Sequence, residues 1–303
     1  MSIVQNWTPD RRSIEMRMGR VRSVFEEMIE NPLTLIGVIV VVSFILLALF
    51  TPLLFPAQGQ DAYQMPRDWQ NAEEPPLSEG HLLGTTQTGG DVLYGIAWGS
   101  RLSIGLSIAV VTVTAFIGTI VGGVAGFVGG WVDDLLMRVV DALIAIPPLI
   151  FALAFVVAVG PAYQNIAIAL MAMMWGSYAR IIRGEVIHVK NNEYVDAARV
   201  AGVSELSLFV RDVLPNAIPP IFVQSTLYFG RVVLIAASLA FIGLAQPGIT
   251  EWGVMISNGQ SDLVAGRWWT SVFPGIAIFL WAFGWNMIGD GLRDVLDPRA
   301  LSE

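Results

Sequence analysis

Two long stretches without a charged residue, Leu33–Phe55 and Leu102–Phe127, constrain the fold of this chain more than any other feature. A helix needs about 20 apolar residues to cross a lipid bilayer. Only 14% of the 303 residues are charged, against about 25% in soluble domains. We therefore expect an all-α integral membrane protein with six transmembrane helices, at Leu33–Phe55, Leu102–Phe127, Val139–Val159, Tyr163–Ile182, Ala217–Ile242 and Phe273–Ile288.

The polar residues divide the chain into segments. Residues 1–32 hold five arginines and suit either a short amphipathic helix at the membrane surface or a disordered basic tail. The first transmembrane helix, residues 33–55, is followed by a polar loop at 56–100. Residues 101–292 form the core domain, with five transmembrane helices and a polar loop at 183–216. Residues 293–303 are a polar tail.

Basic residues predict the orientation of the chain. Thirteen of the 17 Lys and Arg residues fall in the N-terminal segment, the loop after the second span, the loop at 183–216 with its flanks, or the tail. Lys and Arg are enriched on the cytoplasmic side of membrane proteins. We therefore expect a multi-pass protein of the cell membrane, with both termini and the 183–216 loop in the cytoplasm and the 56–100 loop outside it.

Residues 193–215 form a polar island between two spans and predict a helical hairpin. Ala197 and Ala198 favour helix, and Gly202 can take the left-handed conformation that ends one. Pro215 is expected to end the second helix. One apolar stripe is expected on that helix, formed by Leu206, Phe209, Val210, Val213 and Leu214. Such a hairpin suits docking into a groove on another protein, although it could also be an ordinary amphipathic surface element.

The spacing of this island resembles the "EAA" loop of ATP-binding-cassette (ABC) importer permeases. The match consists of Asp196-Ala197-Ala198, then Gly202, then Leu214-Pro215. Asp196 replaces the usual Glu, and Asp212 stands where an apolar residue is usual. The resemblance implies that the loop seats in ATPase subunits and couples them to the membrane helices. The coupling residues would be Glu193, Tyr194, Asp196, Ala197, Ala198, Gly202, Leu206, Phe209, Leu214 and Pro215.

Two further motifs resemble the dipeptide/oligopeptide/nickel branch of that family. Residues 81–103 are similar to its "HxLGTDxxGRDVLxRxxxGxRxSL" pattern, except that Thr86 and Gly90 replace its Asp and Arg. Residues 289–299 are similar to its closing "GDGLRDxLDPR". Between these motifs, the four-residue spacing of Gly118, Gly122, Gly126 and Gly130 favours close helix packing.

The resemblance implies a six-helix type I permease fold and half of a heterodimeric pore. The partners would be a second homologous permease, two ABC ATPase subunits, an extracytoplasmic solute-binding protein and the lipid bilayer. The cargo would be di- or oligopeptides, nickel complexes or oligosaccharides. We expect no enzyme activity and no cofactor on this chain. It contains no G-x-x-x-x-G-K-[ST] phosphate loop, and its single lysine is Lys190. ATP would bind to the partner subunits.

Other function classes have less support in the sequence. An ion-coupled secondary transporter usually keeps ionisable groups at mid-membrane, and only Arg231 and Asp141 are candidates here. No filter-like stretch indicates a channel, and no Ser/His pair indicates a protease within the membrane. The net charge of −8 argues against a nucleic-acid partner. Arg231, Pro147 and Pro148 are the candidate residues of a translocation path, although Arg231 could instead snorkel or pair with a neighbouring subunit. The proline pair is expected to kink the third span, either as part of a pore-lining helix or as a purely structural bend.

Overall fold

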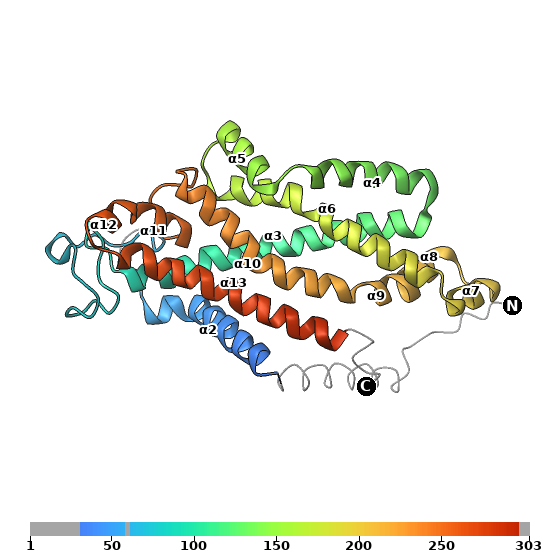
Figure 1. The fold of residues 1–303 in the computed structure, drawn as a ribbon, viewed down its shortest axis with the longest axis horizontal. Helices are drawn as coiled ribbons and strands as arrows, with labels where there is room; N and C mark the ends of the chain where they lie inside the picture. The colour runs from blue at the N-terminus through green and yellow to red at the C-terminus, as the bar shows by residue number, and fades with distance from the viewer. Residues whose placement is uncertain (1–30, 58–60, 297–303) are drawn as a thin grey trace.

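The computed structural model describes residues 31–57 and 61–296, and in these it is built from helices running along one long axis (Figure 1). Five of them are long and apolar enough to cross a membrane, and a sixth span results if the bent pair α4 and α5 counts as one. The six predicted spans therefore correspond to α2 (Pro32–Leu54), α3 (Val92–Val128), α4 (Gly130–Ala145) with α5 (Pro148–Val159), α6 (Tyr163–Lys190), α10 (Pro219–Phe241) and α13 (Trp269–Leu296).

Short elements lie at the two ends of this bundle. One end, which we call the hairpin end, carries the hairpin between α6 and α10. The opposite end, the loop end, carries the loop between α2 and α3 and the connection between α10 and α13. The hairpin consists of α7 (Glu193–Val200), α8 (Glu205–Ser207), the π-helical turn η2 (Leu208–Val213) and α9 (Leu214–Ala217). The loop end contains the 3-10 turn η1 (Trp69–Asn71), α11 (Trp252–Asn258) and α12 (Gln260–Val264).

Helices α3 and α6 pack closely because glycines of α3 face the backbone of α6. A Cβ atom on Gly118 would lie 2.6 Å from the carbonyl oxygen of Trp175, and one on Gly126 would lie 2.8 Å from that of Arg183. The predicted glycine packing face is therefore confirmed for three of its four members. Gly130 has no such neighbour and instead begins α4.

The third span, expected over Val139–Val159 with a kink at Pro147 and Pro148, is broken at that proline pair into two helices. The chain leaves α4 at Ile146 and begins α5 at Pro148, with a bend of 82° between the two helices. The charged stretch at 131–141, expected to be a break, is helical in α4. Its Asp133 carboxylate receives two hydrogen bonds from Arg183 of α6, at 2.5 and 2.6 Å. These two hydrogen bonds pair the negative charge of Asp133 with Arg183, within a helical stretch that the sequence pattern did not predict.

Several helix ends differ from the expected ones. Helix α3 begins at Val92, within the stretch expected to be loop, because the Asp91 side chain accepts a hydrogen bond from the Tyr94 backbone N–H and caps the helix. The predicted fourth span continues as α6 to Lys190, whose Nζ donates to the carbonyl oxygens of Gly126 and Phe127 at the end of α3. The predictions for residues 1–30 and 297–303 lie outside the described residues.

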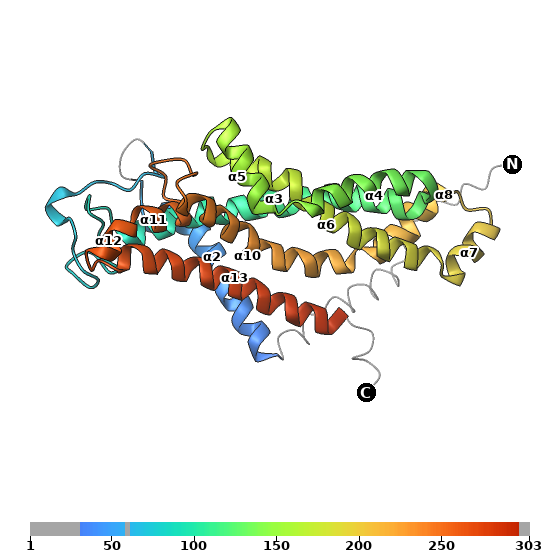
Figure 2. The ribbon, with the colours of Figure 1, turned by 45° about the horizontal axis from the view of Figure 1, so that its top comes forward.

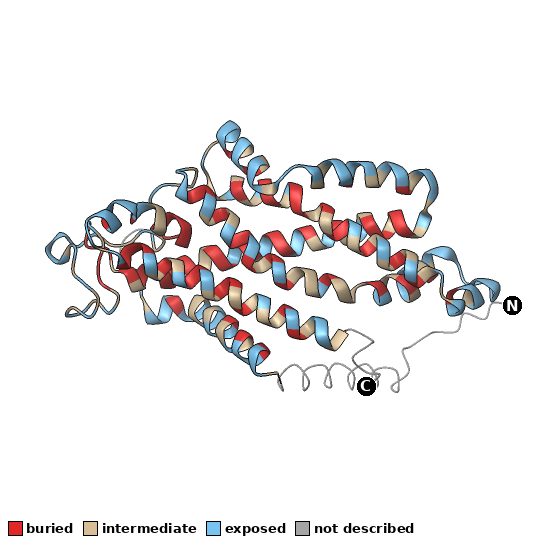
Figure 3. Cartoon of the chain, in the orientation of Figure 1, coloured by how far each residue is buried: buried red, intermediate tan, exposed pale blue. Residues whose placement is uncertain are grey.

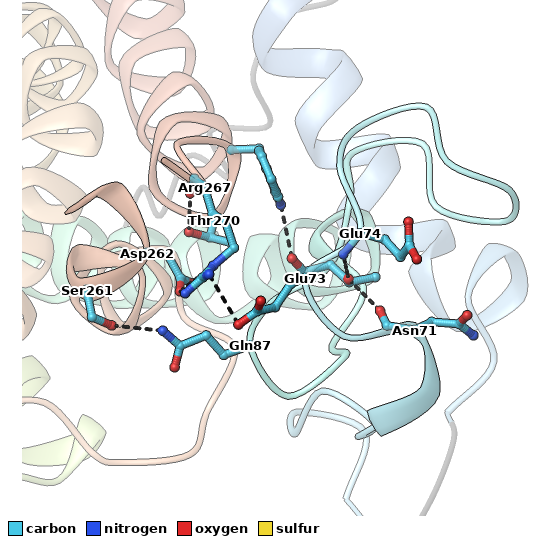
Figure 4. A network of polar contacts seen from close by, with 10 residues as sticks. Asn71, Glu73, Glu74, Gln87, Ser261, Asp262, Arg267 and Thr270 are labelled. Carbon is cyan, nitrogen blue, oxygen red and sulfur yellow. Dashed lines mark hydrogen bonds and ion pairs between the residues drawn. The ribbon is translucent and has the colours of Figure 1, made fainter. Parts of the chain in front are cut away.

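A polar network ties the loop end together (Figure 4). The Arg267 guanidinium is bonded to Asp262 at 2.9 Å and to Glu73 of the first loop at 3.2 Å. Nearby, the buried Glu251 carboxyl group accepts from Ser103 Oγ of α3 at 3.2 Å and from the Val254 backbone N–H at 3.1 Å. Together these contacts hold the first loop, α3 and the α10–α13 connection in one assembly.

Candidate functional site

The hairpin lies at one end of the long axis, and its helix α7 stands beyond the ends of α4 and α13 in both views (Figures 1 and 2). Val195 of α7 and Leu208 and Val213 of η2 are fully buried and belong to the same apolar core as α3 and α6. These three side chains anchor the hairpin to the membrane helices. The hairpin is therefore part of the folded bundle rather than a loose loop.

The turn between α7 and α8 has the geometry that the sequence predicted. Gly202 has φ +85°, which residues with a side chain rarely adopt. Arg199 spans the turn, with hydrogen bonds to Asp196 at 2.8 Å and to Glu205 at 2.7 Å. The Arg199 hydrogen bond lowers the pKa of the Glu205 carboxyl. Ser204 holds the N-cap position of α8 but makes no side-chain cap hydrogen bond.

Pro215 does not end the second helix, contrary to the prediction. The backbone is π-helical over Leu208–Val213, so the Leu214 N–H donates to the carbonyl oxygen of Phe209, five residues back. Pro215, which has no N–H to donate, lies in the first turn of α9. The Asp212 carbonyl oxygen accepts from the Asn216 side-chain amide at 2.6 Å and lies 3.5 Å from the Tyr194 hydroxyl. The wider turn and these side chains accommodate the proline.

The π turn also divides the expected apolar stripe. Phe209 and Leu214 face α3, where the Phe209 ring lies 4.9 Å from that of Phe127. Leu206 and Val210, expected on the same stripe, are instead 73% and 51% exposed. Leu208, which the sequence prediction missed, is fully buried. Its five-residue spacing from buried Val213 equals the hydrogen-bond spacing of a π-helical turn, and a search at three- and four-residue spacing does not detect it.

Five apolar or aromatic side chains of the hairpin are exposed. Val200 is 90% exposed, and Tyr194 and Val203 are also exposed, beside Leu206 and Val210. Figure 3 shows α7 as almost entirely exposed. We call these five residues the hairpin patch. Of the other predicted coupling residues, Glu193, Asp196, Ala197, Gly202 and Pro215 are exposed, and Ala198, Phe209 and Leu214 are half-buried.

The three candidate path residues lie on α5 and α10, away from the hairpin, and residues close to them in the sequence line an open groove. Pro147 and Pro148 begin α5, and Arg231 is exposed near the middle of α10. An apolar groove of about 550 Å³ runs between α5, α10 and α13. It is lined by Leu149, next to Pro148, and by Leu234, three residues after Arg231. In the described residues, no group of three or more His, Asp or Glu side chains is placed to hold a metal ion.

These observations define a class of protein: a multi-pass membrane permease with a rigid helical hairpin at one end. The chain belongs to the family of binding-protein-dependent transport system inner membrane components, whose model matches residues 116–302. Residues 20–76 match the N-terminal transmembrane domain of oligopeptide transport permease C. It is therefore an inner-membrane permease of the ABC dipeptide/oligopeptide type and not an enzyme, since ATPase activity in this family lies on separate subunits. The resemblance drawn from residues 81–103 and 193–215 is confirmed.

Named dipeptide permeases are similar in sequence to this chain over almost its whole length. The dipeptide transport system permease protein DppC of Alkalihalophilus pseudofirmus is 38% identical over 282 residues, which cover 93% of this chain and 90% of that protein. The protein of the same name in Escherichia coli K12 is 39% identical over 274 residues, 89% of this chain and 90% of that protein. The probable D,D-dipeptide permease DdpC of Escherichia coli K12 is 36% identical over 271 residues, 89% of both chains.

Proposed function

We propose that this permease carries di- or oligopeptides inward and forms half of the translocation pore with a second, homologous permease. The cargo is inferred from relatives that are dipeptide permeases by name. A solute-binding protein outside the membrane delivers the peptide, and two ABC ATPase subunits drive the cycle. ATP binds to those subunits, so this chain needs no cofactor. Nickel complexes and oligosaccharides are alternative cargoes, implied only by the wider resemblance.

The observation that carries the coupling proposal is the hairpin patch. Val200 and Leu206, at 90% and 73% exposed, are apolar side chains on a segment whose neighbours are charged. Exposed apolar clusters rimmed by polar residues mark protein interaction sites. The hairpin therefore docks into an ATPase subunit, which places it and both termini in the cytoplasm, in agreement with the distribution of basic residues.

The way the hairpin is attached supports a role in transmitting motion. It follows α6 after two residues and leads through α9 directly into α10. Val195 and Leu208 fix it to the core, and Arg199 braces its turn. When ATP closes the ATPase dimer, the hairpin moves with its docking groove, and α6 and α10 move as rigid bodies between inward- and outward-facing states.

The test is reconstitution in proteoliposomes with the subunits that co-purify with this chain. Gly202→Val is expected to insert normally but to lose the stimulation of ATPase activity by peptide-loaded binding protein, because a β-branched residue resists positive φ. The matched control is Gly184→Val on α6, where an added Cβ meets nothing within 4 Å. Normal stimulation in Gly202→Val would contradict the coupling role, and absence of any ATPase subunit from the purified complex would contradict the proposed assembly.

A further inference from the structure

Helix α10 carries a line of polar side chains along a face that is otherwise apolar. Gln224, Arg231 and Ser238 are seven residues apart, so they return to nearly the same side of an α-helix at intervals of about 10.5 Å. Arg231 and Ser238 are exposed, and Gln224 is half-buried. We call these three residues the polar track. Their exposed neighbours on α10 are all apolar: Phe222, Leu227, Leu234 and Phe241.

Arg231 is the charged member of the track and lies deep in the span. It is twelve residues from Pro219 and ten from Phe241, the ends of α10, which corresponds to roughly 18 and 15 Å along the axis. The side chain cannot reach a membrane surface at either distance. A cation at that depth faces water or a partner of opposite charge, because exposure to lipid is costly.

Within the described residues, no carboxylate pairs with Arg231 and its guanidinium makes no hydrogen bond. The guanidinium lies over the Tyr228 ring, whose centre is 5.7 Å from the guanidinium carbon. That ring is held in place by Tyr178, which packs edge-on at 5.1 Å. The cation is thus oriented by an aromatic side chain while its hydrogen-bond donors stay available.

One end of the track reaches the open groove between α5, α10 and α13. Ser238 lines that groove together with Leu234, Leu149 and Phe279, whereas Arg231 and Gln224 do not line it. Arg231 and Ser238 are both exposed, so this part of the track lies on an open face of the bundle and not against its core.

We propose that the polar track faces the translocation pathway and that Arg231 binds the carboxylate of the peptide in transit. This inference rests on the proposed peptide-import function. A guanidinium can bind a carboxylate through two parallel hydrogen bonds, and every peptide with a free C-terminus carries that group. The uncharged Gln224 can hydrogen-bond to peptide groups, and Ser238, whose hydroxyl donates to the Leu234 carbonyl oxygen at 2.8 Å, can still accept a hydrogen bond. Both hold the cargo less tightly than a charged group would, so that it can leave.

The first experiment uses the absence of cysteine from this chain. Gln224→Cys, Arg231→Cys and Ser238→Cys are assembled separately with cysteine-free partner subunits and treated with a charged, membrane-impermeant methanethiosulfonate. Thiolates react only where water reaches them, so all three positions should be labelled, and a peptide cargo should slow the labelling. Ile39→Cys, an exposed position on α2, is the control expected to stay unreactive.

The same Arg231→Cys protein tests whether uptake of the peptide needs a positive charge at position 231. Its ATP-driven uptake of a free-carboxylate peptide should fall by about tenfold, the loss expected for one hydrogen bond between charged groups. A reagent that attaches an ethylammonium group should restore much of the uptake, and one that attaches an ethylsulfonate should not. The C-terminal amide of the same peptide, compared at equal occupancy of the binding protein, should be carried almost equally before and after the substitution.

Three results would overturn the proposal. They are a Cys at position 231 that stays unreactive in the assembled transporter, an equal loss of uptake for carboxylate and amide peptides, and rescue that is independent of the sign of the added charge. If Arg231→Gln instead prevents association with the second permease, Arg231 pairs with an acid on that subunit and the cargo role is excluded. In each case ATP-driven peptide uptake by the wild-type transporter would still support the proposed function. Absence of that uptake would contradict both the proposed function and the cargo role of Arg231.

Discussion

Gly122 of α3 lies directly against the backbone of Ala179 in α6, so closely that a Cβ atom on Gly122 would stand 2.1 Å from the Ala179 carbonyl oxygen. Two helices in lipid gain little from burying apolar surface and depend on close packing instead. Ala179 lies on α6, the helix that leads into the hairpin. The position of the hairpin relative to α3 therefore depends on this packing.

Gly122→Ala should lower the stability of the fold. The added methyl group cannot fit without separating the two helices, and overpacking of this kind costs about 1–3 kcal/mol. The measurement is the thermal midpoint of the detergent-purified protein. Gly105→Ala, also on α3, is the matched control, because its added Cβ meets nothing within 4 Å. An equal thermal midpoint for the two variants would contradict the assigned packing.

Charge placed on the hairpin patch should abolish ATPase docking without unfolding the permease. Val200→Glu and Leu206→Glu alter side chains that are 90% and 73% exposed, so the fold loses no core contact. We expect normal amounts in the membrane and loss of the ATPase subunits on co-purification. The control is Val264→Glu at the loop end, where the side chain is 93% exposed. Retention of the ATPase by both hairpin variants would place the docking surface elsewhere.

Most of the fold was predictable, because hydrophobic length and glycine spacing are local signals. The spans at Leu33–Phe55 and Ala217–Ile242 correspond closely to α2 and α10. The bend at Ile146 was predicted, because its signal is local: Pro147 and Pro148 follow directly, and a proline disfavours helix at the residue before it. The helical stretch around Asp133 was not predicted, since it depends on a partner far away in the sequence. Arg183 stabilises Asp133 from fifty residues away, and no window of the sequence contains both residues.

The presence of the hairpin was predictable from the sequence, but which of its apolar side chains are buried was not. Positive φ at Gly202 follows from the local pattern, and it was expected. The burial of Leu208 and the exposure of Leu206 depend on the π turn, which itself follows from how Pro215 is accommodated next to α3. A proline can end a helix or lie in its first turn. Packing against Phe127 and Gly123 accompanies the second outcome here.

Truncation of Phe209 should weaken the attachment of the hairpin to α3. Its ring packs against Phe127 at 4.9 Å and against Gly123, but it is only half-buried. Phe209→Ala should therefore cost about 2 kcal/mol, less than the 3–5 kcal/mol typical of a fully buried Phe. We expect ATPase subunits to bind while peptide-stimulated ATP hydrolysis falls. Phe209→Leu, which keeps most of the contact, should retain coupling; equal coupling in wild type and Phe209→Ala would show that this contact does not transmit motion.

Glu251 should make the stability of the loop end depend on pH. Burial raises the pKa of its carboxyl above the ordinary value. The folded state therefore holds a proton that the unfolded state releases, so stability from this group is fully present below the unfolded pKa and is lost as pH rises through the folded value. Because Gln does not ionise, Glu251→Gln removes the loss of stability at high pH. Its side-chain amide can keep the hydrogen bonds with Ser103 and Val254. The thermal midpoint of the variant should equal that of wild type near pH 4 and exceed it near pH 8. The exposed Glu79→Gln is the control, and parallel pH profiles for wild type and Glu251→Gln would show that the buried carboxyl does not affect stability.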